Sequence, residues 1–136
     1  MMEEDERIRL LFLTLDELRA CSERGVPIIV EGKKDVKALR ALDLWGEVVH
    51  PSGGTISEFA ERLARAHGEV VVLTDWDGTG ERLCRMIART MRAMECKPDT
   101  RIRGRFKHLT GRECKDVECL YRLFEKLMES KQSKKL

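Results

Sequence analysis

The chain of 136 residues lacks several features that would place it in a specialised class of protein. No apolar run approaches the roughly 20 residues that a membrane-spanning helix needs. The acidic start, MMEEDERIRL, does not have the pattern of a secretory signal. These absences argue against a membrane protein and predict a cytoplasmic one.

Cysteine pairs at metal-binding or disulfide-framework spacing are also lacking. The five cysteines are odd in number, widely scattered and without a C-x-x-C pair, so they predict buried free thiols and no zinc site. They are Cys21, Cys84, Cys96, Cys114 and Cys119.

Net charge is close to balanced, at +2, but its distribution is uneven. Residues 1–81 hold 10 Lys and Arg against 17 Asp and Glu, a balance of −7, and residues 82–136 hold 16 against 7, a balance of +9. An acidic half followed by a basic half suits a metal site beside a surface that binds a polyanion. Solvated helix surfaces would give the same count, and both interpretations stay open.

The length fits one domain with one core, in which strand and helix patterns alternate. Short β-branched runs predict strands, and apolar residues at three-to-four spacing predict the helices between them. The expected strands are Val26–Val30, Glu47–His50 and Val70–Leu73, and the expected helices are Glu3–Arg24, Lys33–Leu42, Thr55–Gly68 and Gly80–Met94. Such alternation is typical of an α/β domain with a parallel sheet.

Two local patterns qualify this prediction. Thr14 and Glu17 form a capping-box pattern, which allows the first helix to break in two. Beyond Pro98 we expect a short helix containing Ile102 and Leu109, preceded by a small edge strand near residues 95–98. A helix over residues 116–130 and a disordered tail over residues 131–136 complete the chain.

Two aspartates follow the strand of residues 70–73, in the run VVVLTDWDGTG. Asp75 and Asp77 are two positions apart, so on an extended backbone both point to one side and Trp76 to the other. Ligands of an open parallel sheet bind beyond the carboxyl ends of its strands, a rule that places Glu31 and Gly54 at the same edge. Clustered carboxylates repel one another unless a cation such as Mg²⁺ neutralises them or one of them takes up a proton.

The residue set E-G-x-x-D (Glu31, Gly32, Asp35), the glycine Gly54 and the set D-x-D-x-x-G (Asp75, Asp77, Gly80) resembles the Toprim domain of topoisomerases, primases and small nucleases. The whole chain is similar to the short stand-alone Toprim proteins of archaea and bacteria. This resemblance implies a compact Rossmann-like domain over residues 26–110, with a mostly parallel sheet of about four strands flanked by helices. Residues 1–25 would be a helical extension, and residues 111–136 a C-terminal helix with a basic tail.

The same resemblance implies Mg²⁺, or Mn²⁺ as its substitute, held by Glu31, Asp75 and Asp77, with Glu31 as the catalytic acid or base. Lys33 and Lys34 are candidate phosphate contacts. A nucleophilic tyrosine of the topoisomerase kind is not expected, because the single tyrosine lies in an amphipathic helix and is expected to pack there.

Other residues could contact a nucleic acid. Gly54 could let a phosphate approach the backbone, or it could only form a turn. Arg82, Arg85 and Arg89, with Arg92, follow helical spacing and make a basic stripe, which is either a nucleic-acid contact or a solvated face.

The leading hypothesis is therefore a Mg²⁺-binding Toprim protein that performs phosphoryl transfer on RNA or DNA, as a nuclease does. One alternative is a non-catalytic, Mg²⁺-dependent nucleic-acid-binding or scaffold module. Another interprets DWDGT as the D-x-D-G-T signature of haloacid-dehalogenase phosphatases, with Asp75 as the nucleophile and Asp77 as the acid. That family needs an acidic pair on a later strand, whereas here only Asp116 and Glu118 remain downstream, on an expected helix. The sequence leaves open a homodimer or a larger nucleic-acid-processing complex.

Overall fold

The computed structural model describes the backbone of residues 2–135 and the side chains of residues 2–130. Four strands form one sheet in the order β2-β1-β3-β4, in which every neighbouring pair is parallel. The strands are β1 (Ile28–Ile29), β2 (Val48–Val49), β3 (Glu69–Val72) and β4 (Lys97–Asp99). The helices of the described part are α1 (Glu4–Glu23), α2 (Lys33–Ala41), α3 (Ile56–Ala66), α4 (Gly78–Ala93), α5 (Arg101–Thr110) and α6 (Val117–Lys135). The predicted α/β class is confirmed.

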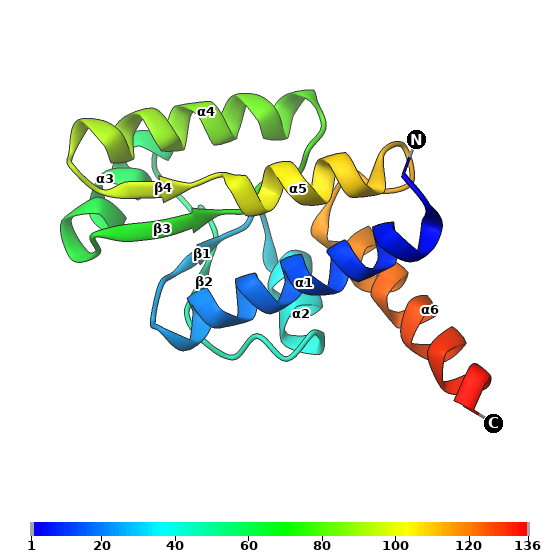
Figure 1. Cartoon of the computed structure of the whole chain (residues 1–136). Coiled ribbons are helices and arrows are strands. Elements are labelled where there is room, and N and C mark those ends of the chain that lie inside the picture. The colour runs from blue at the N-terminus through cyan, green and yellow to red at the C-terminus, as the bar shows by residue number, and fades with distance from the viewer. Residues whose placement is uncertain (1, 136) are drawn as a thin grey trace.

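Alternating side chains on the two central strands divide the core into two parts. Ile28 and Val71 are paired in register and pack with α1, α2, α5 and α6. Ile29 and Val72 point to the opposite face and pack with α3 and α4. Because all four side chains are fully buried, the sheet is covered on both faces, and Figure 1 shows α4 on one side of it and α1 and α2 on the other.

Thr14 does not break the first helix. Its hydroxyl donates a hydrogen bond back to the carbonyl of Leu10 (2.7 Å), so it bonds the preceding turn and does not cap a new one. The helix continues to Glu23, and Gly25 follows with a φ of +83°. The break that the capping-box pattern allowed is therefore absent, and α1 is one continuous helix.

The region after Pro98 forms the elements that the sequence favours. Lys97–Asp99 makes the edge strand β4, and Asp99 then caps α5, since its Oδ1 accepts from the backbone N–H of Arg101 (2.9 Å). The helix α5 ends at Gly111, which has a φ of +55°. The chain thus turns from the sheet edge directly into a helix that packs against α1 (Figure 1).

Two of the five cysteines form a disulfide, so the prediction of five free thiols is wrong for this pair. Cys114 and Cys119 are joined across a separation of five residues, where the chain enters α6. So short a link closes one local turn and leaves no framework pattern in the sequence. Cys21, Cys84 and Cys96 are free and buried as predicted, and burial raises the pKa of each thiol.

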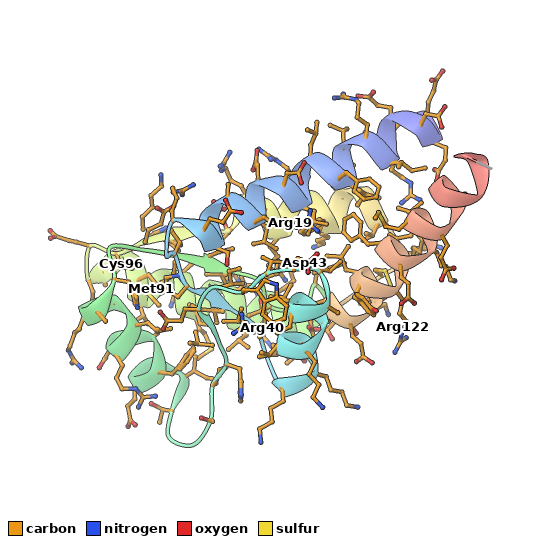
Figure 2. All side chains as sticks on the ribbon, turned by 90° about the horizontal axis from the view of Figure 1, so that it is seen from below. Arg19, Arg40, Asp43, Met91, Cys96 and Arg122 are labelled. Atoms are coloured by element: carbon orange, nitrogen blue, oxygen red, sulfur yellow. A yellow bond between two sulfur atoms is a disulfide. The ribbon has the colours of Figure 1, made fainter. Side chains whose placement is uncertain are left out.

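Arginines from two helices hold the connection between α2 and β2. Arg40 donates to the carbonyl of Gly46 (2.6 Å), and Arg19 donates to the carbonyl of Leu42 (3.0 Å). Asp43, labelled together with both arginines in Figure 2, takes a φ of +65° in this loop. These bonds satisfy loop carbonyls that no strand or helix reaches, and they fix how the chain enters β2.

Within the described residues, no helix is long and apolar enough to cross a membrane. The helix α6 is assigned as far as Lys135. The predicted disordered tail, residues 131–136, lies outside the residues whose side chains are described.

Candidate functional site

Glu31 and Asp75 meet where the order of the strands reverses. From β1 the chain passes through α2, on one face of the sheet, to β2; from β2 it returns through α3, on the other face, to β3. β1 and β3 are neighbours, and the backbone N–H of Leu73 donates to the carbonyl of Ile29 (2.8 Å), just before both acidic residues. The carboxyl ends of the two strands at such a reversal are the usual ligand site of an open α/β sheet, and we call this place the crevice.

Asp75 is the most perturbed acid of this crevice. Its Oδ1 is buried without a hydrogen-bond partner, and its pKa is raised to about 8. Desolvation is the largest cause, followed by hydrogen bonding to Glu31 and by repulsion from the charges of Glu31, Asp35 and Asp116. The crevice therefore favours a proton or a cation at Asp75 over a bare carboxylate.

Asp35 and Asp116 contribute charge to the crevice while they cap helices. Asp35 is buried, its Oδ2 accepts from the backbone N–H of Gly32 (3.2 Å) at the start of α2, and its pKa is raised mainly by desolvation. Asp116 Oδ1 accepts from the backbone N–H of Cys119 (2.8 Å) at the start of α6. Repulsion from Asp116, Glu31 and Glu118 adds to the raised pKa of Asp35. From the sequence, Asp116 and Glu118 were considered only as the acidic pair of a phosphatase, and their proximity to Asp35 was not predicted.

Asp77 has an extended backbone (φ −86°, ψ −178°), as expected, and it is the N-cap residue of α4. Its exposed side chain caps α4, with Oδ1 accepting from the backbone N–H of Gly80 (2.7 Å). Trp76 is buried between the two aspartates, in the part of the core that α1, α2, α5 and α6 cover. The structure thus brings Glu31 and Asp75 together and places Asp77 at a helix terminus.

The acidic groups have the oxygen donors that a hard divalent cation prefers, but their side chains are not arranged around one point. Among the described side chains, no group of three or more Asp, Glu, His or Cys residues is arranged to hold a metal ion. The orphaned Oδ1 of Asp75 and its neighbouring carboxylates nevertheless supply the oxygen donors that Mg²⁺ takes.

The turn between β3 and α4 needs a glycine at residue 80. A Cβ atom built there would overlap the carbonyl group of Asp75, so α4 packs directly on the backbone of the acidic residue. Thr74 Oγ1 donates to the carbonyl of Gly80 (2.9 Å) and closes the same turn. The start of α4 and the backbone of Asp75 are therefore held together.

Arg103 of α5 fixes the other side of this turn. Its guanidinium, whose side chain is 5% exposed, donates to the carbonyls of Thr74 (2.8 Å) and Asp75 (2.6 Å). It also pairs with Glu81 (3.2 Å), which Lys107 reaches as well (2.6 Å). The two hydrogen bonds satisfy carbonyls beyond the end of β3, and the ion pair holds the guanidinium there, so Arg103 is a positioning residue for Asp75.

The start of α6 is attached to the acidic turn through Trp76. The indole Nε1–H donates to the carbonyl of Cys114 (2.7 Å), and the backbone N–H of Trp76 donates to the carbonyl of Lys115 (2.7 Å). Because the disulfide between Cys114 and Cys119 closes this segment, the position of Asp116 is tied to that of Asp75. The sequence offered no signal for this contact between segments about 40 residues apart.

The remaining candidates lie around the crevice. Lys33 and Lys34 are exposed in the first turn of α2. Gly54 has a φ of +67° in the loop that follows β2. A positive φ favours glycine, so the turn alone explains why this residue is a glycine. The side chain of Tyr121 is partly buried against the core, as expected of a packing residue, and its hydroxyl donates to Glu125 (2.8 Å).

The predicted arginine stripe lies on α4 and begins near the crevice. Arg82, Arg85 and Arg89 are exposed, and so is Arg92. They extend along α4 from the terminus that Asp77 caps. The basic face therefore starts beside the carboxylates and leads away from them.

The chain is similar to a group of archaeal proteins. Residues 25–103 match the family model of the Toprim domain. A UPF0292 protein of Methanosarcina barkeri is 39% identical over 122 residues, which cover 90% of this chain and 83% of that protein. A UPF0292 protein of Thermococcus onnurineus is 38% identical over 114 residues, with coverage of 84% and 83%. A solved structure of an Aquifex aeolicus protein superposes with a TM-score of 0.66 at 27% identity, covering 79% of this chain and 95% of that one.

We expect Gly80→Ala to destabilise the protein by about 1–3 kcal/mol, because the added methyl group would push α4 off the Asp75 carbonyl. Gly78→Ala is the matched control: it lies in the same helix turn, and a Cβ there meets nothing within 4 Å. Denaturant unfolding of both variants measures the difference. Equal stabilities would show that the turn relaxes freely.

The raised pKa of Asp75 predicts how the stability of the fold depends on pH in the absence of divalent cations. Its pKa rises from 3.8 in the unfolded chain to about 8 in the fold, so between these values the folded state holds a proton that the unfolded state has released. The stability contributed by this group is present at pH 4 and is lost as the pH rises to about 8. Asp75→Asn should remove that loss and unfold a few degrees above the parent at pH 9.

Thermal unfolding from pH 4 to pH 9 in a chelator, for parent and variant, measures this effect. Mg²⁺ should raise the unfolding temperature of the parent at pH 9 more than that of Asp75→Asn, since a cation then replaces the proton. Parallel curves for the two proteins would contradict the assignment.

We expect Arg103→Met to destabilise the protein by about 3–5 kcal/mol, because it leaves two carbonyls and the partly buried Glu81 without their shared donor. Arg101→Met is the control on the same helix: that side chain is 69% exposed and only 3.9 Å from Asp99, so we expect less than about 1 kcal/mol. Denaturant unfolding compares the two. A positioning role further requires that Arg103→Lys, although folded, shifts the apparent pKa measured at Asp75.

Proposed function

The chain belongs to the Toprim family, among the small archaeal UPF0292 proteins, and from that premise we propose that it performs metal-dependent cleavage of nucleic-acid phosphodiesters. Toprim domains generally act with a divalent metal on nucleic acids, which supports the broader part of this proposal. One observation carries it to this chain. The unpartnered Oδ1 of Asp75 lies with Glu31 in the crevice between β1 and β3.

The proposed ligands are Glu31, Asp75 and Asp77. All three offer hard oxygen donors, and the repulsion that raises the pKa of Asp75 would turn into attraction for a cation. When bound, Mg²⁺, or Mn²⁺ in its place, would polarise the scissile phosphate and stabilise the leaving oxygen. Asp77 keeps its second oxygen for this purpose while the first caps α4.

The protein's own groups would supply orientation and proton transfer. Glu31, beside Asp75 at the open end of β1, is placed to take a proton from the attacking water or to return one to the leaving group. Lys33 and Lys34, exposed in the next helical turn, would attract the phosphate backbone, and Gly54 borders the loop beyond β2. Arg82, Arg85 and Arg89 would bind the part of the polymer that lies outside the crevice.

A non-catalytic binding or scaffold module is the second candidate, and one observation favours it. Asp77 is used as a helix cap, and no three acidic side chains among residues 2–130 are arranged as a finished metal site. A cation could then stabilise a nucleic-acid-binding surface without any bond being cleaved. A cytoplasmic location and association with a larger complex stay predictions in both cases.

Asp75→Asn should lower Mg²⁺ affinity at least about tenfold and lower cleavage of labelled RNA or DNA by on the order of 100-fold or more, because it removes a charged ligand. Asp43→Asn is the control: it makes the same change at an exposed loop residue with a φ of +65°, which asparagine tolerates. Calorimetric Mg²⁺ titration and gel assays of cleavage measure the two effects.

The outcomes separate the candidates. Mg²⁺ binding that depends on Asp75, without cleavage of RNA or DNA in Mg²⁺ or Mn²⁺, would favour the scaffold. Release of phosphate from small phosphomonoesters, with an acyl-phosphate trapped on Asp75, would instead support the haloacid-dehalogenase alternative. Cleavage unaffected by Asp75→Asn would contradict the proposed site.

A further inference from the structure

A basic groove runs between α4 and α5. Arg85, Arg89 and Arg92 line it from α4, and Thr100 and Arg103 line it from the side of α5. Its volume is about 460 Å³, and Cys84, Ala88 and one acidic residue of α4, Glu81, also line it. Arg82, although part of the stripe predicted from the sequence, does not line this groove, so the stripe divides into two faces.

The three α4 arginines of this groove have no partner among the described side chains. Among the described side chains, Arg85, Arg89 and Arg92 make no ion pair, and their guanidinium groups make no hydrogen bond. Arg103 is different, because its charge is used by Glu81 and by the turn at Asp75. Three exposed guanidinium groups on one side of a helix repel one another, and they are most stable beside an anion of matching length.

In a neighbouring hollow, some of the basic groups have acidic partners. Around β4 and the end of α1, Arg24 lies 3.8 Å from Glu69, and Arg101 lies 3.9 Å from Asp99. Glu17, which lines the same hollow, is bound by Arg105 at 2.7 Å. Acidic groups therefore compensate Arg24 and Arg101 along that edge, although Arg92 and Lys97 also line this hollow without an ion pair among the described side chains. The α4–α5 groove keeps an uncompensated charge of about three.

The direction of α4 connects this groove to the acidic crevice. α4 begins at the Asp77 cap, and at a rise of about 1.5 Å per residue Arg85 lies roughly 12 Å and Arg92 roughly 22 Å along its axis. One strand of a duplex carries a phosphate about every 3.4 Å, so the stretch from Arg85 to Arg92 spans about three phosphates. A strand lying in the groove would thus point toward the crevice.

We propose that the α4–α5 groove binds the phosphate backbone of a nucleic-acid strand through Arg85, Arg89 and Arg92. The inference rests on the proposed function, for which the groove supplies the holding surface. Guanidinium groups bind phosphate oxygens in pairs, and no aromatic side chain lines the groove to stack on a base. Binding is therefore independent of base sequence and strongly dependent on salt.

The test is fluorescence anisotropy with labelled 20-nucleotide RNA and DNA of mixed sequence, in a chelator and from 50 to 300 mM salt. The triple variant R85Q/R89Q/R92Q should lose at least about tenfold in affinity at 100 mM salt. Its slope of log affinity against log salt should be shallower by about 2, since each lost phosphate contact removes about 0.7 for a single strand. All three side chains are exposed, so thermal unfolding should change by no more than a few degrees.

The matched control is R62Q/K37Q/K126Q, which removes the same charge from exposed side chains on α3, α2 and α6. These residues also lack ion pairs in the described part of the chain. We expect the control to retain the parental salt slope. Equal losses in both triple variants would assign binding to diffuse charge and overturn the groove, as would competition by polyglutamate equal to that by polyphosphate.

A separate arm distinguishes failure of the groove from failure of the metal site. Asp75→Asn should bind the labelled strands in the chelator at least as tightly as the parent does, even though it loses Mg²⁺ affinity. Groove binding that persists without any cleavage supports the groove while contradicting the nuclease. Absence of binding by the folded parent to either polymer at 50 mM salt overturns the groove.

Discussion

The burial of Asp75 beside other acidic groups, at the ends of β1 and β3, is the constraint that the surrounding structure has to meet. A carboxyl group with a buried, unpartnered oxygen and a pKa near 8 is unfavourable for folding in its charged form. Such a group persists only where the surrounding backbone holds it in place. Here a buried arginine, a close helix turn and a tryptophan provide that support.

Each support acts on the backbone and leaves the carboxylate free. Arg103 binds the carbonyl groups of Thr74 and Asp75, and Gly80 lets α4 contact the Asp75 carbonyl. Trp76 anchors the next residue to the start of α6. Because the polar backbone atoms are satisfied while the side-chain oxygen is not, the arrangement favours a ligand from outside, and α4 carries the same fixed frame to the basic groove.

The sequence predicted those features that depend on local pattern. β-branched runs identified the central strands, and the rule that ligands lie beyond strand ends placed Glu31 beside Asp75. The same reasoning did not predict that the Asp77 side chain caps α4, because this bond depends on where that helix begins. Arg103 and Asp116 were missed as members of the site, since their roles come from helices that only tertiary packing brings to the crevice.

The family match also ends at residue 103, whereas Asp116 and the 114–119 disulfide lie beyond it. The crevice is therefore built partly from a C-terminal segment that the shared motifs do not describe. Asp116 adds negative charge to Asp75 while Trp76 holds the segment that carries it. A cation entering this crevice would meet more charge than the family's three acidic residues supply, so the start of α6 can tune how tightly it is held.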